Sequence, residues 1–152
     1  MEAFAGISVS PLRIIGDERG RVMKVLSSAD PQFAGFGEAY LSTVAPGTVK
    51  GWKTHLKTVQ NMAVPIGRIT FLLKDRRPES PTFGRSVRVT LAGEPGLYRL
   101  LTVPPGVSYA WRNDSPAESY VTNCQSAPHD PAEGVTAPLE EDPPDWEGAQ
   151  EM

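Results

Sequence analysis

Short segments in which apolar and polar residues alternate run through most of this chain, and such alternation is typical of half-buried β-strands. The pattern is clearest at residues 68–74 and 85–91, whose apolar faces are Ile69, Phe71 and Leu73 and then Val87, Val89 and Leu91. Further strands are predicted at residues 8–15, 21–26, 37–44, 49–64, 98–103, 107–112 and 119–123. No stretch carries a convincing helical period, so the pattern predicts an all-β protein.

Turn residues separate the predicted strands. Runs of turn-forming residues lie at positions 17–20, 45–47, 65–67 and 104–106, and the chain contains 14 glycines and 15 prolines. Glycine supplies positive φ angles and proline fixes φ near −65°, so both are typical of tight turns. About ten short strands joined by turns indicate a β-sandwich or a β-barrel.

The composition changes near Ala127, where prolines and acidic residues become frequent and apolar residues become rare. Such a segment has little surface to bury. We therefore expect residues 134–152 to form an extended or disordered acidic, Pro-rich tail behind a domain of residues 1–133. Trp146 is the exception, and we expect it to dock the tail onto a surface, such as that of a second subunit.

Length and charge narrow the class of protein. The chain has 152 residues, which suits one domain, and a net charge of −3, which gives no sign of nucleic-acid binding. It has one cysteine, Cys124, no basic and apolar leader at its start, and no apolar run near the roughly 20 residues of a membrane helix. We therefore expect a cytoplasmic protein without an intrachain disulfide or a membrane partner.

Residues 49–61 carry the most suggestive polar pattern. If this stretch is extended, Lys53, His55 and Lys57 lie on one face, because the side chains of a strand alternate between faces. Neighbouring ammonium groups attract anions and favour the neutral form of an imidazole, which can then act as a general base. The alternative is an edge strand with solvated lysines and an ordinary surface histidine.

Other kinds of site find little support in the sequence. It has no phosphate-binding loop and no dinucleotide-binding glycine pattern. His55 and His129 are its only histidines, so a metal site built from three histidines is excluded within one subunit, whereas a mixed carboxylate site is not. Cys124 lacks the surroundings of a nucleophile and is interpreted as a small buried residue. We expect neither a metal nor an organic cofactor.

Four segments in a fixed order carry a more specific signal. They are Asp17-Glu18-Arg19-Gly20, Val49-Lys50-Gly51 with His55, Asp75-Arg76-Arg77-Pro78-Glu79-Ser80-Pro81-Thr82-Phe83-Gly84, and Val103-Pro104-Pro105-Gly106-Val107-Ser108-Tyr109-Ala110-Trp111. Together they resemble the dTDP-4-dehydrorhamnose 3,5-epimerase family over residues 10–133, and in particular a short branch found near cell-surface sugar genes. The resemblance implies a cupin-type jelly roll, which is a double-stranded β-barrel.

The resemblance also implies roles for individual residues. The family's base, a histidine that takes a proton from the carbon next to the ketone, matches His55, and its anion-binding basic residue matches Lys50, although the spacing differs by two residues. The arginine that reaches the nucleotide matches Arg19. The lysine that stabilises the enolate oxygen falls near Gln60 or Asn61, whose amides are weaker donors than an ammonium group.

Several family residues have no clear counterpart. Tyr109 stands where the family has a histidine, and the position of the catalytic tyrosine falls near Gln125 or Ser126. Tyr109 and Tyr120 are therefore the candidate acids, although aromatic residues are equally expected in a β core. We find no counterpart of the C-terminal aspartate that pairs with the family's histidine.

These observations predict an isomerase or epimerase that acts on a nucleotide-linked 4-keto-6-deoxy sugar, in the biosynthesis of a cell-surface polysaccharide or a deoxysugar. The alternatives are a noncatalytic cupin that binds a sugar or a nucleotide, and a 3,4-ketoisomerase. The resemblance implies a homodimer in which an N-terminal strand is exchanged. His129, which follows the last strand, is expected to matter little. The predicted pocket is lined by Lys53 or Lys57, His55, Gln60, Asn61, Arg68, Tyr109 and Tyr120.

Overall fold

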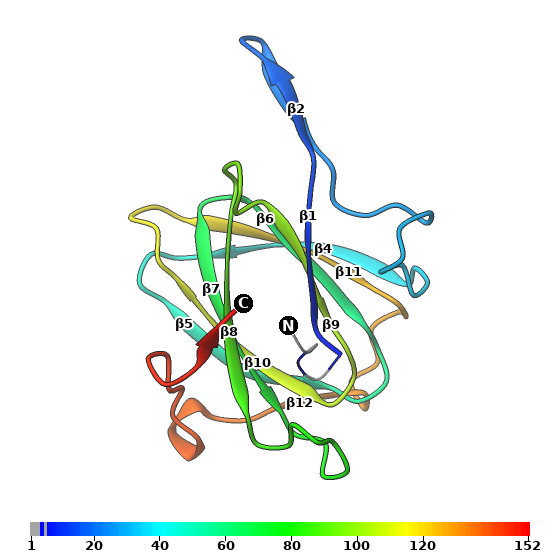
Figure 1. The fold of residues 1–152 in the computed structure, drawn as a ribbon, viewed down its shortest axis with the longest axis vertical. Coiled ribbons are helices and arrows are strands. Elements are labelled where there is room, and N and C mark those ends of the chain that lie inside the picture. Colours follow the sequence, from blue (N-terminus) through cyan, green and yellow to red (C-terminus); the bar gives the residue numbers. More distant parts are fainter. Residues whose placement is uncertain (1–3, 5) are drawn as a thin grey trace.

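Two β-sheets form the body of the computed structural model, which describes residues 4 and 6–152. One sheet contains β1 (Ser8–Pro11), β4 (Glu38–Val44), β6 (Gln60–Ile66), β9 (Arg99–Val103) and β11 (Ser119–Gln125), in the order β1-β9-β6-β11-β4. The other contains β5 (Val49–His55), β7 (Arg68–Asp75), β8 (Ser86–Ala92), β10 (Val107–Asn113), β12 (Gly134–Thr136) and β13 (Gln150–Glu151), in the order β12-β5-β10-β7-β8-β13. The sheets face each other as a jelly roll, so the predicted all-β fold is confirmed (Figure 1).

A separate hairpin of β2 (Ile14–Asp17) and β3 (Gly20–Met23) projects away from the barrel (Figure 1). The only helical turn in the described part of the chain is a 3-10 turn at Leu139–Glu141. None of the helical structure in residues 4 and 6–152 is long and apolar enough to cross a membrane.

The core lies between the two sheets and follows the predicted alternation. Ile69, Phe71 and Leu73 of β7 are at most 1% exposed and pack between the sheets. The apolar face predicted for residues 85–91 packs against them, because β8 pairs with β7 along its whole length. Inward and outward positions are therefore fixed strand by strand, and this parity decides which polar side chains reach the interior.

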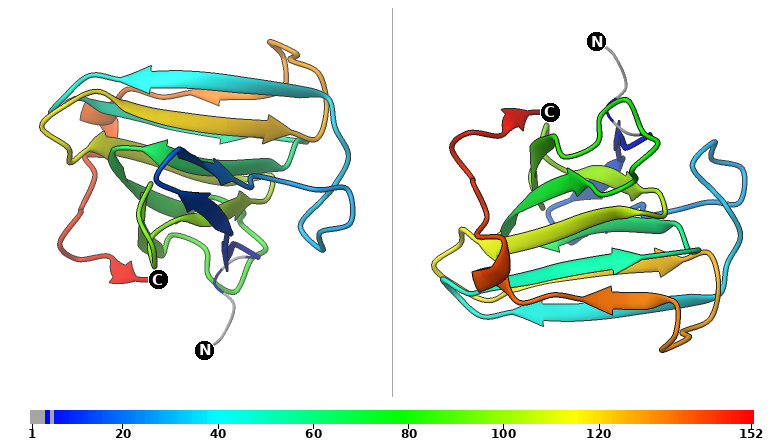
Figure 2. Two further views of the ribbon diagram at one scale, coloured as in Figure 1. Left: turned by 90° about the horizontal axis from the view of Figure 1, so that it is seen from above. Right: turned by 90° about the horizontal axis from the view of Figure 1, so that it is seen from below.

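The acidic tail is extended and lies on the barrel of its own chain. It starts as β12, directly after the expected boundary at residue 133, and β12 pairs with β5 of the barrel. It ends as β13, which runs parallel to β8 (Figure 2). Trp146 packs on the outer face of the six-stranded sheet beside Leu72, with the guanidinium of Arg112 4.7 Å from its ring centre. The carboxylate of Asp142 forms ion pairs with Lys74 and Arg76 from the same sheet.

The docked tail explains an apolar residue that breaks the alternation. Leu72 points outward between inward-facing neighbours, yet it is 1% exposed. It is covered together with Trp52, whose indole Nε1 donates a hydrogen bond to the carbonyl oxygen of Asp142 at 2.6 Å. The tail therefore gives the six-stranded sheet a second buried face.

We predict that Trp146→Ala loosens the tail and lowers the free energy of unfolding by about 2 kcal/mol. The reason is that the substitution removes the contact of a half-buried aromatic side chain with the apolar cluster on the outer face of the sheet. Urea unfolding, together with limited proteolysis of residues 134–152, measures both effects. Glu140→Ala, at an exposed tail position, is the matched control and should change stability by less than about 0.5 kcal/mol. Equal proteolysis of the two variants would contradict this role of Trp146.

Candidate active site

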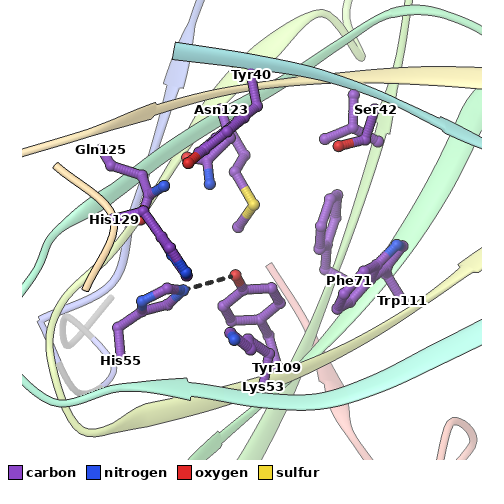
Figure 3. Close-up of a pocket in the computed structure, with 12 residues that line it drawn as sticks. Tyr40, Ser42, Lys53, His55, Phe71, Tyr109, Trp111, Asn123, Gln125 and His129 are labelled. Carbon is purple, nitrogen blue, oxygen red and sulfur yellow. Dashed lines mark hydrogen bonds between the residues drawn. The ribbon is translucent and has the colours of Figure 1, made fainter. Parts of the chain in front are cut away.

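A cavity of about 440 Å³ lies between the two sheets (Figure 3). Its size falls in the range of about 300–1,000 Å³ that is usual for small-molecule sites. Both sheets and the loop that follows β11 contribute its walls, which consist of Tyr40, Ser42, Lys53, His55, Met62, Phe71, Tyr109, Trp111, Val121, Asn123, Gln125 and His129.

A β-bulge in β5 sets the side chains of this strand. Gly51 and Trp52 together lie opposite the single residue Ala110 of β10. Gly51 has φ of 128°, and a Cβ atom there would lie 2.7 Å from the Cα of Ala110, so only glycine allows the strands to approach so closely. As a result, Trp52 turns to the outer face under the tail, whereas Lys53 and His55 face the cavity.

Glu133 holds the imidazole of His55 from behind. Nδ1 of His55 lies 2.9 Å from one carboxylate oxygen, and the other oxygen accepts hydrogen bonds from the backbone N–H groups of Lys57 and Thr58 and from the Thr58 hydroxyl, at 2.9–3.0 Å. Burial alone would raise the pKa of Glu133, but these hydrogen bonds, led by that from His55, lower it to about 2. The carboxylate can then only accept, so Nδ1 of His55 is the donor, and in the neutral form of the imidazole Nε2 carries the lone pair.

Tyr109 faces that lone pair. Its hydroxyl lies 3.3 Å from Nε2 of His55, and the two rings stack with their centres 6.3 Å apart. Burial raises the pKa of Tyr109 well above its ordinary value, and the charge of Glu133 raises it further. The phenol therefore stays protonated at neutral pH, and its hydroxyl lies beside Nε2 on the cavity wall (Figure 3). The arrangement has the parts of a general base: an oriented imidazole, a carboxylate behind it and access to the cavity.

The opposite wall is a polar surface on the five-stranded sheet. Asn123 and Gln125 of β11 are tied to the buried side chain of Gln60, at 2.6 and 3.3 Å. Tyr40 of β4 lies beside Asn123 in register, and its hydroxyl donates to the carboxylate of Glu38. This wall therefore presents mainly neutral polar groups to the base.

Lys53 provides the positive charge of the cavity. Its Nζ lies against Gly134 of β12, where a Cβ atom would approach it to 3.0 Å. Within residues 4 and 6–152, no acidic side chain forms an ion pair with Lys53. A cation that is half-buried and without a protein counter-charge suits an anionic group of a ligand.

Comparison with known proteins agrees with this geometry. The profile of a family described as dTDP-4-dehydrorhamnose 3,5-epimerase matches residues 2–142. The chain belongs to the dTDP-4-dehydrorhamnose 3,5-epimerase family. The resemblance seen in the sequence is thereby confirmed over nearly the whole chain.

Individual relatives of the family extend the comparison. A crystal structure of a dTDP sugar isomerase from Desulfovibrio desulfuricans is 42% identical, with a TM-score of 0.88 over 97% of this chain and 94% of that one. The spore coat polysaccharide biosynthesis protein SpsL of Bacillus subtilis is 30% identical over 107 residues, which is 70% of each chain. The probable low-salt glycan biosynthesis epimerase Agl13 of Haloferax volcanii is 33% identical over 85 residues, so the match spans about half of its length.

The structure brings together only some of the residues that the sequence analysis assigned to the site. Lys53, His55 and Tyr109 line the cavity, and Gln60 lies directly behind its wall. Lys57 does not complete the predicted row of cations, because β5 ends at His55 and the lysine side chain turns out to solvent.

Four other predicted residues lie outside the cavity of this subunit. Asn61 and Tyr120 have the outward parity of β6 and β11, where Asn61 bonds to Thr102. Lys50 is exposed and bonds to the carbonyl oxygen of Thr43. Arg68, at the start of β7, pairs with Glu94 on the surface. Parity therefore removes Tyr120 as a candidate acid of this cavity.

Arg19 is also remote from the cavity within one subunit. It lies at the exposed tip of the β2–β3 hairpin and pairs with Asp17. Its predicted contact with a nucleotide requires a neighbouring subunit.

Several residues of the site were missed by the sequence analysis, among them Glu133, Tyr40 and His129. Glu133 supplies the acidic partner of the histidine, for which the sequence offered no counterpart. Tyr40 and His129 line the cavity, although His129 was expected to matter little. The sequence shows Glu133 only as one acidic residue of an acidic segment. Its contact with His55 depends on the pairing of β12 with β5, which the sequence pattern did not predict.

No group of three or more His, Cys, Asp or Glu residues that could hold a metal ion occurs among residues 4 and 6–152.

We predict that Glu133→Gln destabilises the protein in a pH-dependent manner. Because folding lowers the pKa of Glu133 from 4.5 to about 2, its charge stabilises the fold fully above pH 4.5 and loses this effect as the pH falls toward 2. The variant should therefore be less stable by about 3 kcal/mol at pH 7. The difference should shrink to near zero at about pH 2.

Denaturant unfolding of both proteins between pH 7 and 2 measures this difference. Glu140→Gln, which changes an exposed glutamate of the tail, serves as the control. A difference between wild type and Glu133→Gln that stays constant over this pH range would mean that the ionised carboxylate is not what stabilises the site.

Proposed function

We propose that the protein is an epimerase that moves a proton at the carbon next to the ketone of a dTDP-linked 4-keto-6-deoxy sugar. The observation that carries this proposal is the buried Glu133–His55 pair. Its geometry points Nε2 of His55 toward a cavity large enough for a small-molecule ligand. Membership of the epimerase family supports the reaction. The names of the relatives from Bacillus and Haloferax support a role in the biosynthesis of a polysaccharide or glycan.

The reaction starts when Nε2 of His55 takes the proton from the carbon beside the ketone. The two electrons of the broken C–H bond form the C=C bond of an enolate, and the ketone oxygen becomes negative. Glu133 stabilises the imidazolium that results, since its carboxylate lies 2.9 Å from Nδ1. Such general-base catalysis typically contributes about 10²–10⁴-fold to the rate.

The enolate oxygen needs a donor, and Lys53 suits that role. It is the cation on the cavity wall, two positions from His55 on the same face of β5. An ammonium group that faces developing negative charge in a site shielded from water gives strong electrostatic stabilisation. Lys53 thus takes the part for which the sequence offered only the amides of Gln60 and Asn61.

The apolar part of the cavity suits the methyl group of a 6-deoxy sugar. Met62, Phe71, Trp111 and Val121 form this part. A hydroxyl group placed there would lose hydrogen bonds to water and gain few in return. The cavity should therefore prefer a sugar with a methyl group at C6 over one with a hydroxymethyl group.

We predict that His55→Asn abolishes proton exchange while the fold persists. Asparagine keeps a side-chain amide to bond with Glu133 but cannot take up the proton. Deuterium incorporation from D₂O into dTDP-4-keto-6-deoxy-D-glucose, followed by mass spectrometry, should fall by at least about 10²-fold. Ser42→Ala, at a hydroxyl of the same cavity, is the control and should keep most of the exchange.

The outcome separates the candidate functions. A wild-type protein that binds the dTDP sugar without exchange would be a noncatalytic binding protein. Exchange with product at a shifted ketone would indicate a 3,4-ketoisomerase. A loss below tenfold in His55→Asn would mean that another residue is the base.

A homodimer is part of the proposal. Ile15 and Val22 lie opposite each other in the β2–β3 hairpin and are 54% and 70% exposed. An apolar pair on a hairpin that projects from its own barrel suits packing against a second copy. Arg19, at the tip of that hairpin, would then approach the neighbour's cavity and the nucleotide.

We expect light scattering at micromolar concentration to give twice the mass of the chain. Val22→Lys should shift the protein toward the monomer, because it places a charge in the apolar contact. Glu18→Lys, in the turn of the same hairpin, should leave the dimer intact. A monomeric wild-type protein would contradict the exchange of the hairpin between subunits.

We also place the protein in the cytoplasm. Cys124 is half-buried and forms no disulfide within the described residues. A free thiol fits a reducing compartment. Fractionation of cells followed by detection of the protein tests this placement.

A further inference from the structure

Both histidines of the chain line the same cavity. His55 comes from β5 of the six-stranded sheet, and His129 comes from the loop after β11 of the five-stranded sheet. Figure 3 shows the imidazole of His129 pointing into the cavity toward that of His55. The proton transfer proposed above uses only one of these two groups.

The loop that carries His129 is fastened on both sides. Before His129, Ser126 exchanges hydrogen bonds with the backbone of Val59, at 2.9 and 3.1 Å. After it, Glu133 accepts from the backbone N–H of Leu56 at 3.0 Å and binds His55. The loop therefore holds His129 in a fixed relation to the base.

Glu38 lies close to His129. The pKa of its carboxylate is lowered, first by the hydroxyl of Tyr40 and then by the backbone and the imidazole of His129. The ring of His129 makes no hydrogen bond to another described residue, so both of its nitrogen atoms are available at the cavity mouth. Glu38 thus provides a counter-charge when the imidazole carries a proton into the cavity.

The other polar groups on this wall are less suited to donate a proton. The hydroxyl of Tyr40 is engaged with Glu38. Asn123 and Gln125 carry amides, which do not transfer protons, and both are tied to Gln60. Imidazole is the side chain that most often moves protons near neutral pH.

We infer that His129 is a second catalytic residue, which protonates the enolate on the face opposite to His55. This inference rests on the proposed epimerase function. Inversion needs the C–H bond to break on one face of the planar enolate and to form on the other. His55 gains the proton that leaves, His129 gives up its own proton to the carbon, and the C=C electrons form the new C–H bond as the ketone returns. Proton exchange with water then resets both imidazoles.

The test is to separate exchange from inversion in His129→Gln. Glutamine keeps a polar side chain but cannot transfer the proton. In D₂O with dTDP-4-keto-6-deoxy-D-glucose, His55 should still exchange the proton, so deuterium enters the recovered substrate within about fivefold of the wild-type rate. Formation of the epimer should fall by at least about 10²-fold. Tyr40→Phe tests the neighbouring hydroxyl as the alternative acid, and Glu140→Gln, at an exposed tail position outside the cavity, is the control that should keep both exchange and inversion.

Three results would overturn the inference. Epimer formation at the wild-type rate in His129→Gln would show that the imidazole is dispensable. An equal loss of exchange and inversion, with a raised KM, would make His129 a binding residue. A split between exchange and inversion in Tyr40→Phe would assign the acid to Tyr40.

Two controls keep the outcomes distinct. The circular dichroism spectrum and melting temperature of His129→Gln should match the wild type, and His129→Asn provides a second variant if they do not. A wild-type protein without any exchange would overturn the proposed function as a whole, whereas exchange without the predicted split would overturn only the role of His129.

Discussion

The carboxylate of Glu133 is the contact on which the site depends. It is 8% exposed and accepts hydrogen bonds from His55, from two backbone N–H groups and from a hydroxyl. A buried carboxylate is costly unless its oxygens are satisfied, so this group holds the end of β5 and the loop before β12 together. The same contact selects the tautomer of His55. The placement of the C-terminal segment and the orientation of the His55 imidazole are therefore coupled through one carboxylate.

Strand parity explains how a single sheet serves both the cavity and the tail. On β10, Tyr109 and Trp111 face the cavity while Ala110 faces outward. On β7, Phe71 faces the cavity and Leu72 faces the tail. The tail covers this outer face with Trp146 and with the ion pairs of Asp142, so the sheet is buried on both sides. A firmly packed sheet in turn keeps the side chains on its inner face in fixed positions.

Much of the fold was predictable because strand alternation and turns are local signals. The inward faces of residues 68–74 and 85–91 and the placement of Lys53, His55 and Tyr109 followed from period and family resemblance. The assignment of residues to the cavity failed where it depends on the inward parity of a strand or on which strands lie side by side. Tyr120 was assigned to the cavity, but its neighbours Ser119 and Val121 have the inward parity of β11.

The residues that were missed have a common physical cause. Tyr40 belongs to an edge strand whose position beside β11 is set by long-range pairing. Glu133 and His129 lie in a Pro-rich, acidic stretch that reads as solvent-exposed tail. Their function arises only because β12 turns back onto β5. The composition of such a segment shows that it has too few apolar residues to fold on its own. It does not show that the segment can pack on the barrel through the pairing of β12 with β5.

The loop after β11 and the start of β12 thus complete the site at three points. Glu133 orients the imidazole of His55, Gly134 leaves the space in which the ammonium group of Lys53 lies, and His129 brings a second imidazole to the mouth of the cavity. A side chain at position 134 would push against that ammonium group, since its Cβ atom would lie 3.0 Å from Nζ. The positive charge and the base therefore depend on neighbouring residues of one short segment. This coupling brings a histidine, a cation and an acidic partner of the histidine together. The cation and the acidic partner stand at positions to which the sequence resemblance did not assign these roles.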